Sequence, residues 1–220
     1  MRSPFERLKS PNAEDWRLYC EHEFVRQLAA GTLPENAFRH YLKQDYLFLV
    51  QFSRAWGLAV YKSRDLAEIR QGLEALKGIV DVEIGLHLRY CAAWDISETE
   101  LAGLQESRAT LAYTRYVLDA GMSGDLLDLH VALAPCIIGY GEIASWSLSQ
   151  PFTKTTGNPY GDWIEMYAGE DYQTLVRSEL EWLNHRLSHV DETRLERLSV
   201  VFRDATRLEA DFWQMGLDLA

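Results

Sequence analysis

Apolar side chains recur along most of this chain at the spacing of an α-helix. The alternation of apolar and polar residues that is typical of strands is absent, and so are the Asn-Gly and Asp-Gly pairs that close hairpins. No linker, internal repeat or low-complexity tract interrupts the pattern. The pattern therefore predicts an all-α helical bundle in which residues 1–220 form a single domain.

Capping residues and prolines indicate where the first long helices begin. Pro34 before Glu35 suits the start of a helix that runs to about Ser63, because proline tolerates the first helical turn. Asp65 and the acidic residue three positions later have the spacing of a capping box. That box predicts a helix from there to about Cys91.

The remaining helices are predicted from similar signals. Ser97 opens a second capping box, and the segment from Gly121 to Gly124 is expected to separate two helices. The segment 153–159, rich in Thr, Gly and Pro, is the clearest loop. Helices are expected at 106–120, across Cys136, near 160–168, at 171–188 and at 192–217.

The charge of the chain disfavours two classes of partner. There are 22 Lys and Arg against 33 Asp and Glu, which gives a formal net charge of -11 at pH 7. An acidic surface repels the phosphate backbone of nucleic acids, and no basic block offsets this. The same repulsion disfavours membranes with anionic lipids. We therefore expect no nucleic-acid partner and no membrane association.

Cysteine usage and the N-terminal sequence bear on the compartment. Cys20, Cys91 and Cys136 are too few and too scattered for a disulfide framework, and no Cys-x-x-Cys pair supports a structural zinc. Residues 1–7 lack the apolar core of a signal peptide. No apolar stretch reaches about 18 residues without a charged or polar residue. We expect a soluble, cytoplasmic protein.

Cys136 directly follows Pro135 in the middle of a long apolar run. Because proline cannot donate a backbone hydrogen bond and crowds the preceding turn, the helix is expected to kink there. Free backbone N–H groups of the next helical half would then face the thiol and favour the reactive thiolate. Two interpretations stay open, an inert cysteine in a kinked core helix and a nucleophile.

Asp45 shares a predicted helix face with aromatic residues. Tyr41, Asp45, Phe48 and Phe52 recur at i, i+4, i+7 and i+11. A carboxylate among rings is costly unless it is paired or hydrogen-bonded. Either Asp45 is bonded to a neighbouring helix in a ring-lined core, or it binds a polar, flat ligand on which Phe48 stacks.

Glu209 has a similar character, since Phe212 and Trp213 follow it by one helical turn. If that face is inward, burial would raise the pKa of the carboxyl group and suit it to proton transfer. The alternative is an exposed carboxylate near the end of a helix.

Three tyrosines are further candidates. Tyr140 lies four residues after Cys136 and therefore over the same helix face, whereas Tyr113 and Tyr167 lie in separate segments. Each of them is more commonly a core tyrosine with a hydrogen-bonded hydroxyl than a site residue.

A metal site has weaker support. Glu83 and His87 are four residues apart, as are Glu181 and His185, but bundle di-iron sites use Glu-x-x-His spacing. Such pairs arise readily by chance, so we expect no metal and no cofactor.

Taken together, these segments resemble the thiaminase II (TenA) family over nearly the whole chain. Five segments occur in the family's order, which is quite specific: 31–34 with Phe38 and 41–45; 83–87; 133–136 with Tyr140 and Glu142; 163–169; and 209–215. The resemblance implies a haem-oxygenase-like fold, a homotetramer and, through Cys136, membership of the cysteine-bearing branch.

The resemblance also implies roles. Cys136 would be the nucleophile that adds to a pyrimidine ring, Glu209 the acid/base, and Asp45 the group that holds the amidine-like ring edge. The polar and stacking shell would be completed by Phe48, Tyr113, Tyr140 and Tyr167. Some members have tyrosine where this chain has Phe48, so stacking is kept but a hydroxyl is lost.

The function implied is thiamin salvage, in which 4-amino-5-aminomethyl-2-methylpyrimidine is hydrolysed to the hydroxymethyl pyrimidine and ammonia, with thiamin as a further substrate. Three alternatives are a transcriptional regulator, which the acidic charge argues against, a haem-oxygenase-like oxidase with a metal or quinone-type cofactor, and a catalytically silent pyrimidine-binding protein. An oxidase needs a ligand set that we cannot assemble here. Retention of Cys136 and Glu209 argues against the silent binder.

Overall fold

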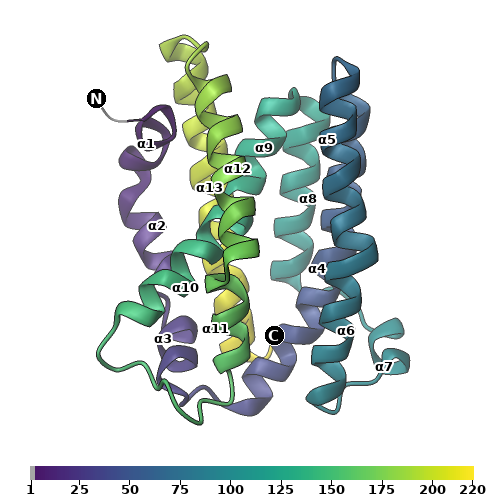
Figure 1. The fold of residues 1–220 in the computed structure, drawn as a ribbon, viewed down its shortest axis with the longest axis vertical. Coiled ribbons are helices and arrows are strands. Elements are labelled where there is room, and N and C mark those ends of the chain that lie inside the picture. The colour runs from purple at the N-terminus through teal and green to yellow at the C-terminus, as the bar shows by residue number, and fades with distance from the viewer. Residues whose placement is uncertain (1–2) are drawn as a thin grey trace. The chain divides into compact units, whose positions relative to one another are not determined.

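The computed structural model describes residues 3–220, and every regular element within these residues is a helix (Figure 1). The prediction of an all-α protein is therefore confirmed. The chain divides into two compact units, which we describe separately. The first unit comprises the described residues up to Leu33 together with His130–Gln214, and the second comprises Pro34–Leu129 together with Met215–Ala220.

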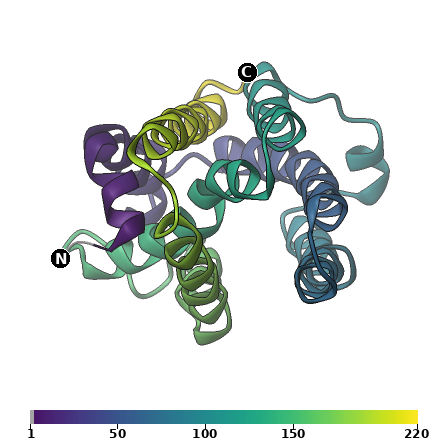
Figure 2. The same cartoon turned by 90° about the horizontal axis from the view of Figure 1, so that it is seen from above.

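The second unit is built around one long helix, α4 (Glu35–Lys62), which begins directly after Pro34 as predicted. Helices α5 and α8 and the turn between α5 and α6 pack against α4. Figure 2 shows α5 and α8 nearly end-on. The remaining elements of this unit are α5 (Leu66–Lys77), the π-helical turn η2 (Gly78–Glu83), α6 (Ile84–Ala93), α7 (Glu98–Ala102) and α8 (Arg108–Ser123).

Side-chain caps fix the starts of these helices. The carboxylate of Asp65 accepts hydrogen bonds from the backbone N–H groups of Ala67 (2.8 Å) and Glu68 (3.0 Å), so the predicted cap is confirmed. The predicted separation of two helices by the segment from Gly121 to Gly124 is confirmed, but it lies at Gly124, which caps α8, and not at Gly121. Gly121 lies inside α8, where an added Cβ would stand 2.8 Å from side-chain atoms of Leu58 and Leu129. Glycine is needed there for close packing, not for a turn.

The first unit has an aromatic core around Trp213. The indole of Trp213 stacks on Phe24 (5.1 Å between ring centroids) and on Tyr19 (6.3 Å). The N-terminal helices that supply these rings were not predicted. The elements of this unit include α1 (Pro4–Lys9), η1 (Ser10–Asn12), α2 (Ala13–Cys20), α3 (Glu23–Ala30), η3 (Pro135–Gly139), α10 (Tyr140–Ser149), α11 (Gly161–Ala168) and α12 (Glu170–Leu187).

Two helices contribute residues to both units, namely α9 (Leu126–Ala134) and α13 (Glu192–Asp218). The stretch Leu126–Ser149, from α9 to α10, is long and apolar enough to cross a membrane by length and composition. Of its most apolar window, 89% is buried inside the protein, which is typical of a core helix.

Candidate functional site

Cys136 lies on a π-helical turn. The helix continues from α9 through η3 into α10 without a break, and Cys136 is 8% exposed. Its thiol donates a hydrogen bond to the carbonyl oxygen of Leu133, with the sulfur 3.0 Å from that oxygen. The expectation that free N–H groups face the thiol was therefore wrong, because the widened turn continues the helix and leaves a carbonyl beside the sulfur.

Two tyrosine hydroxyls bind the backbone of this turn. The hydroxyl of Tyr19 donates to the carbonyl of Pro135 (3.1 Å), and that of Tyr172 lies 3.2 Å and 3.0 Å from the carbonyls of Cys136 and Ile137. A π-helical turn disturbs the regular backbone ladder, and these hydroxyls give its carbonyls buried partners. Tyr19 and Tyr172 thus fix the backbone that carries the thiol.

Gly139 allows this arrangement. A Cβ at this position would stand 2.4 Å from Cε1 and 2.7 Å from the hydroxyl oxygen of Tyr19. No side chain fits there unless Tyr19 moves away from the turn.

Glu209 is 1% exposed, so the interpretation as an exposed helix-end carboxylate was wrong. It lies one turn before Trp213 on α13, just as Cys136 lies one turn before Tyr140. The rings of Trp213 and Tyr140 are in contact, with 5.3 Å between centroids. The two faces that carry Glu209 and Cys136 therefore meet inside the first unit.

The pKa of Tyr19 is sensitive to the charges of the groups around the π-helical turn. Burial raises the pKa of the Tyr19 hydroxyl well above the ordinary value, and negative charge on Glu209, Cys20 and Cys136 raises it further. Both Glu209 and Cys136 thus lie within electrostatic range of one buried phenol, which stays protonated and donates to Pro135.

The two candidate tyrosines of the first unit lie in a ring cluster with Trp163. The ring centroids of Tyr140 and Tyr167 are 4.9 Å apart, and Trp163 lies 5.7 Å from Tyr140 and 4.6 Å from Tyr167. Tyr140 is 6% exposed and Tyr167 8%. Tyr140 lies four residues after Cys136, and the rings of Trp163 and Tyr167 contact Tyr140. These rings offer surfaces on which a flat ligand could stack.

The second unit contains Asp45, Phe48 and Tyr113. Asp45 is buried on α4, and its Oδ2 lies 3.4 Å from Nδ1 of His87 on α6. Phe48 stacks on Tyr113 of α8 with 5.3 Å between centroids and an interplanar angle of 22°. The sequence interpretation of a carboxylate in a ring-lined core, bonded to a neighbouring helix, agrees with these contacts.

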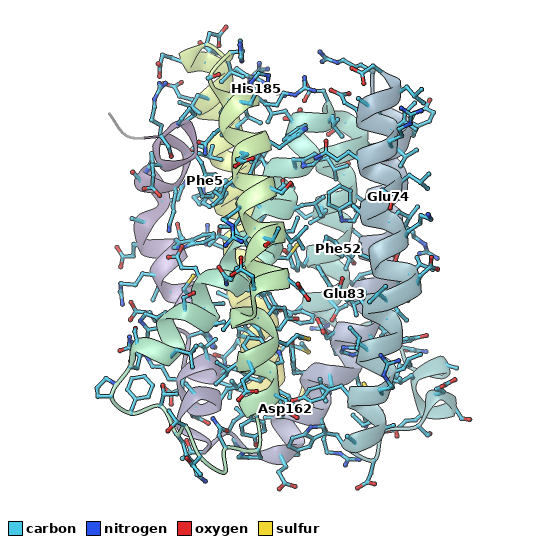
Figure 3. The ribbon with its side chains drawn as sticks, in the orientation of Figure 1. Phe5, Phe52, Glu74, Glu83, Asp162 and His185 are labelled. Atoms are coloured by element: carbon cyan, nitrogen blue, oxygen red, sulfur yellow. The ribbon has the colours of Figure 1, made fainter. Side chains whose placement is uncertain are left out.

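Acidic groups surround Asp45. Burial raises the pKa of Asp45 to about 7, and this effect is larger than that of a hydrogen bond with Tyr41, which lowers the pKa. Burial and the charge of Asp45 raise the pKa of Glu83, on η2, to about 7 as well; Figure 3 shows where Glu83 lies on this turn. Burial raises the pKa of Cys91 to about 12, so this thiol stays protonated at neutral pH.

His87 is a residue of this cluster whose contacts could not be predicted from the sequence. The spacing of Glu83 and His87 raised the question of a metal, but Nε2 of His87 lies 2.9 Å from the carbonyl oxygen of Leu42. Within residues 3–220, no group of three or more His, Cys, Asp or Glu side chains could hold a metal ion.

Other residues of the site were also missed. Tyr19 and Tyr172 contact the π-helical turn from positions far away in the sequence, and no spacing pattern links them to Cys136. The structure thus brings Cys136, Tyr140, Tyr167 and Glu209 into one unit, and it brings Asp45, Phe48 and Tyr113 into the other.

The fold and these residues define an all-α protein with a buried thiol and a buried carboxylate in a ring-rich core. A thiol and a carboxyl group of this kind can combine covalent catalysis with proton transfer. A family model described as the TENA/THI-4/PQQC family matches residues 11–219. The chain belongs to this family.

Individual relatives agree with the family. A Haemophilus influenzae protein named only as uncharacterized is 46% identical over 205 residues, 93% of this chain and 94% of that protein. The aminopyrimidine aminohydrolase of Halalkalibacterium halodurans is 32% identical over 91% of this chain and 89% of its own. A crystal structure from a Silicibacter species, titled a TenA family transcription regulator, has 43% identity, covers 97% of this chain and 96% of its own, and superposes with a TM-score of 0.89.

Proposed function

We propose that this protein is an aminopyrimidine aminohydrolase (thiaminase II). Its substrate would be 4-amino-5-aminomethyl-2-methylpyrimidine, which it would hydrolyse to the 5-hydroxymethyl pyrimidine and ammonia in thiamin salvage. The relative from Halalkalibacterium carries the name of this activity. The observation that supports the proposal most directly is the buried Cys136 on a π-helical turn whose carbonyls bind two tyrosine hydroxyls, in the same unit as the buried Glu209.

The chemistry requires a nucleophile because an amine is a poor leaving group. Cys136, as the thiolate, would add to an electron-poor carbon of the pyrimidine ring and move an electron pair onto a ring nitrogen. The disrupted ring then expels the protonated amine from the exocyclic carbon, leaving a methylene group. Water adds to this carbon and loses a proton, and the thiolate departs with its electron pair as the ring becomes aromatic again.

Glu209 would move the protons of these steps. The amine must be protonated to leave, and the attacking water must lose a proton. One carboxyl group serves both needs if it gives its proton first and accepts one later. Its burial, at 1% exposure, excludes bulk water from competing for these protons.

The remaining residues would bind the ring. Asp45 offers a buried carboxyl group to the amidine-like edge of an aminopyrimidine. Phe48 and Tyr113 supply a stacked pair of rings, while Tyr140 and Tyr167 supply a second pair that is tilted by 58°. No cofactor is required for this reaction.

The proposal is tested by incubating the purified protein with the aminomethyl pyrimidine. We expect the hydroxymethyl pyrimidine by mass spectrometry and one ammonia per product molecule. Heat-denatured protein controls for spontaneous hydrolysis. If a folded protein, verified by circular dichroism, binds the pyrimidine but releases no ammonia, the protein is a binding protein and not an enzyme for this substrate.

A second candidate function is transcriptional regulation, because the Silicibacter relative carries that title. The net charge of -11 makes direct contact with DNA electrostatically unfavourable. We expect no saturable, salt-sensitive binding of a DNA fragment at micromolar protein and physiological salt. Such binding would support the regulator instead.

We also propose that the protein is a cytoplasmic homotetramer, as the family resemblance implies. Exposed apolar side chains on α5 and η2, including Leu66, Leu73 and Val80, are compatible with contacts between copies. Light scattering after gel filtration should give about four times the chain mass of 25.3 kDa. A mass of one or two chains would contradict this.

A further inference from the structure

The imidazole of His87 lies between a backbone carbonyl and the carboxyl group of Asp45. Its Nε2 is 2.9 Å from the carbonyl oxygen of Leu42, and its Nδ1 is 3.4 Å from Oδ2 of Asp45. The side chains are 9% and 10% exposed, so little water reaches the contact. All three residues belong to the second unit, Leu42 and Asp45 to α4 and His87 to α6.

The carbonyl of Leu42 determines which ring nitrogen carries the proton. A carbonyl oxygen can only accept, so Nε2 of His87 must donate. In the neutral ring, Nδ1 then has a lone pair, which faces Oδ2 of Asp45. Two lone pairs facing each other in a buried contact repel, unless one proton lies between them.

The other groups around this contact make an ionised pair unfavourable. Tyr41 on α4 hydrogen-bonds Asp45, Glu83 on η2 and Cys91 on α6 interact with it electrostatically, and Lys43 acts on Cys91. A carboxylate at Asp45 would be close to a second acid, Glu83. Burial also lowers the pKa of His87, which disfavours the imidazolium.

We propose that His87 is a positioning residue that keeps one proton on Asp45, so that the carboxyl group meets its ligand as a neutral acid. This rests on the proposed function, in which Asp45 binds the edge of an aminopyrimidine. That edge has a weakly basic ring nitrogen beside an amino group. In the free protein the O–H of Asp45 is directed at Nδ1 of His87; on binding it turns to the ring nitrogen, and the other carboxyl oxygen accepts from the amino group.

The same proton can also be passed on. When the bound ring nitrogen takes it, the O–H bond of Asp45 breaks, its electron pair stays on the carboxylate, and an N–H bond forms on the pyrimidine. The protonated ring is then more electrophilic and is paired with a carboxylate by a charge-assisted hydrogen bond. No proton from solvent is required for this step.

The resting protein gives the first test. Two-dimensional NMR of the imidazole nitrogens, with the signals of His87 assigned from a His87→Gln variant among the six histidines, should show a neutral ring protonated at Nε2 at pH 7. The carboxyl carbon of Asp45 should show the chemical shift of an acid at pH 6 and of a carboxylate above pH 8. An imidazolium, or a ring protonated at Nδ1, would overturn the proposal whether or not the protein is an enzyme.

A pair of variants gives the second test. His87→Gln keeps an N–H donor for the carbonyl of Leu42 but places no acceptor at Nδ1, whereas His87→Asn can keep an oxygen acceptor near that position. Without an acceptor for its proton, Asp45 should be a stronger acid. We therefore expect His87→Gln to lower kcat/KM for the aminopyrimidine about tenfold at pH 7 and to move the alkaline loss of activity to lower pH.

His87→Asn should recover activity and pH dependence in part. Equal activity of the two variants, with the wild-type pH profile, would overturn the proposal. If the wild type itself releases no ammonia, the proposed function fails, and the NMR measurement alone still decides where the proton lies.

Discussion

Replacing Asp45 with asparagine should make the protein more stable at alkaline pH. Asp45 is 7% exposed, and burial raises the pKa of its carboxyl group from the ordinary 3.8 to about 7. Between pH 4 and pH 7 the folded protein thus keeps a proton that the unfolded chain has released. The free energy of unfolding of the wild type must therefore fall as the pH rises through this window.

The size of the effect follows from the two pKa values. The difference between 3.8 and about 7 corresponds to a loss of roughly 4 kcal/mol when the window is fully crossed. The asparagine side chain has no proton to lose, and its amide keeps the shape and can still hydrogen-bond Tyr41. The stability of the Asp45→Asn variant relative to the wild type should rise between pH 4 and 7 and then level off.

The assay is urea unfolding of both proteins at half-unit steps from pH 4 to pH 8.5. Glu83 and His87, whose own pKa values are shifted by burial, are present in both proteins, so the difference in free energy reports Asp45 together with the effect of its charge on Glu83. Asp162→Asn, at an exposed position on α11 (Figure 3), controls for the loss of one negative charge. A difference that is flat with pH, or that falls, would refute the reasoning.

The remaining predictions concern the first unit. Glu209→Gln should leave binding of the pyrimidine largely intact in a direct isotherm and lower kcat by about 100-fold or more, because the amide cannot move protons; wild-type turnover would remove its role. Gly139→Ala should destabilise the protein by roughly 1–3 kcal/mol in urea unfolding, since its Cβ would stand 2.4 Å from a ring carbon of Tyr19. Gly57→Ala, where a Cβ meets nothing within 4 Å, is the matched control and should not destabilise. Tyr172→Phe should cost roughly 1–3 kcal/mol, because two carbonyls lose their partner. Tyr61→Phe, at a residue that is 83% exposed, should leave the stability unchanged. Equal losses of stability in both variants would show that the hydroxyl of Tyr172 does not stabilise the π-helical turn.

The sequence predicted the elements better than it predicted the contacts. Caps such as Asp65 act within a few residues, so they could be recognised locally and most helix boundaries were correct. Gly121 shows the limit of this approach, because the same residue serves turns and close helix packing. The two roles of glycine can be distinguished only from the atoms that surround it in the folded protein, here those of Leu58 and Leu129.

The candidate site shows the same division. The amphipathic pattern around Asp45 indicated a carboxyl group among rings, and the structure buries it there. His87, which contacts Asp45, could not be predicted as its partner. It lies 45 residues after Leu42, to whose carbonyl it also binds, and local spacing suggested only a pair with Glu83. Pro135 indicated an irregular helix, but the sequence did not show that the irregularity is a π-helical turn whose carbonyls accept hydrogen bonds from hydroxyls of α2 and α12.

The central claim is that Cys136 is the nucleophile of an aminopyrimidine aminohydrolase. The measurement that tests it most directly is the initial rate of ammonia release from the aminomethyl pyrimidine by Cys136→Ser and by Cys91→Ser, each verified to be folded. Both thiols are buried, but burial raises the pKa of Cys91 to about 12 and makes it an inert control. We predict that Cys136→Ser loses nearly all turnover, because a hydroxyl is a far weaker nucleophile at neutral pH, and that Cys91→Ser keeps it. Equal losses in both variants, or full activity in Cys136→Ser, would contradict the claim.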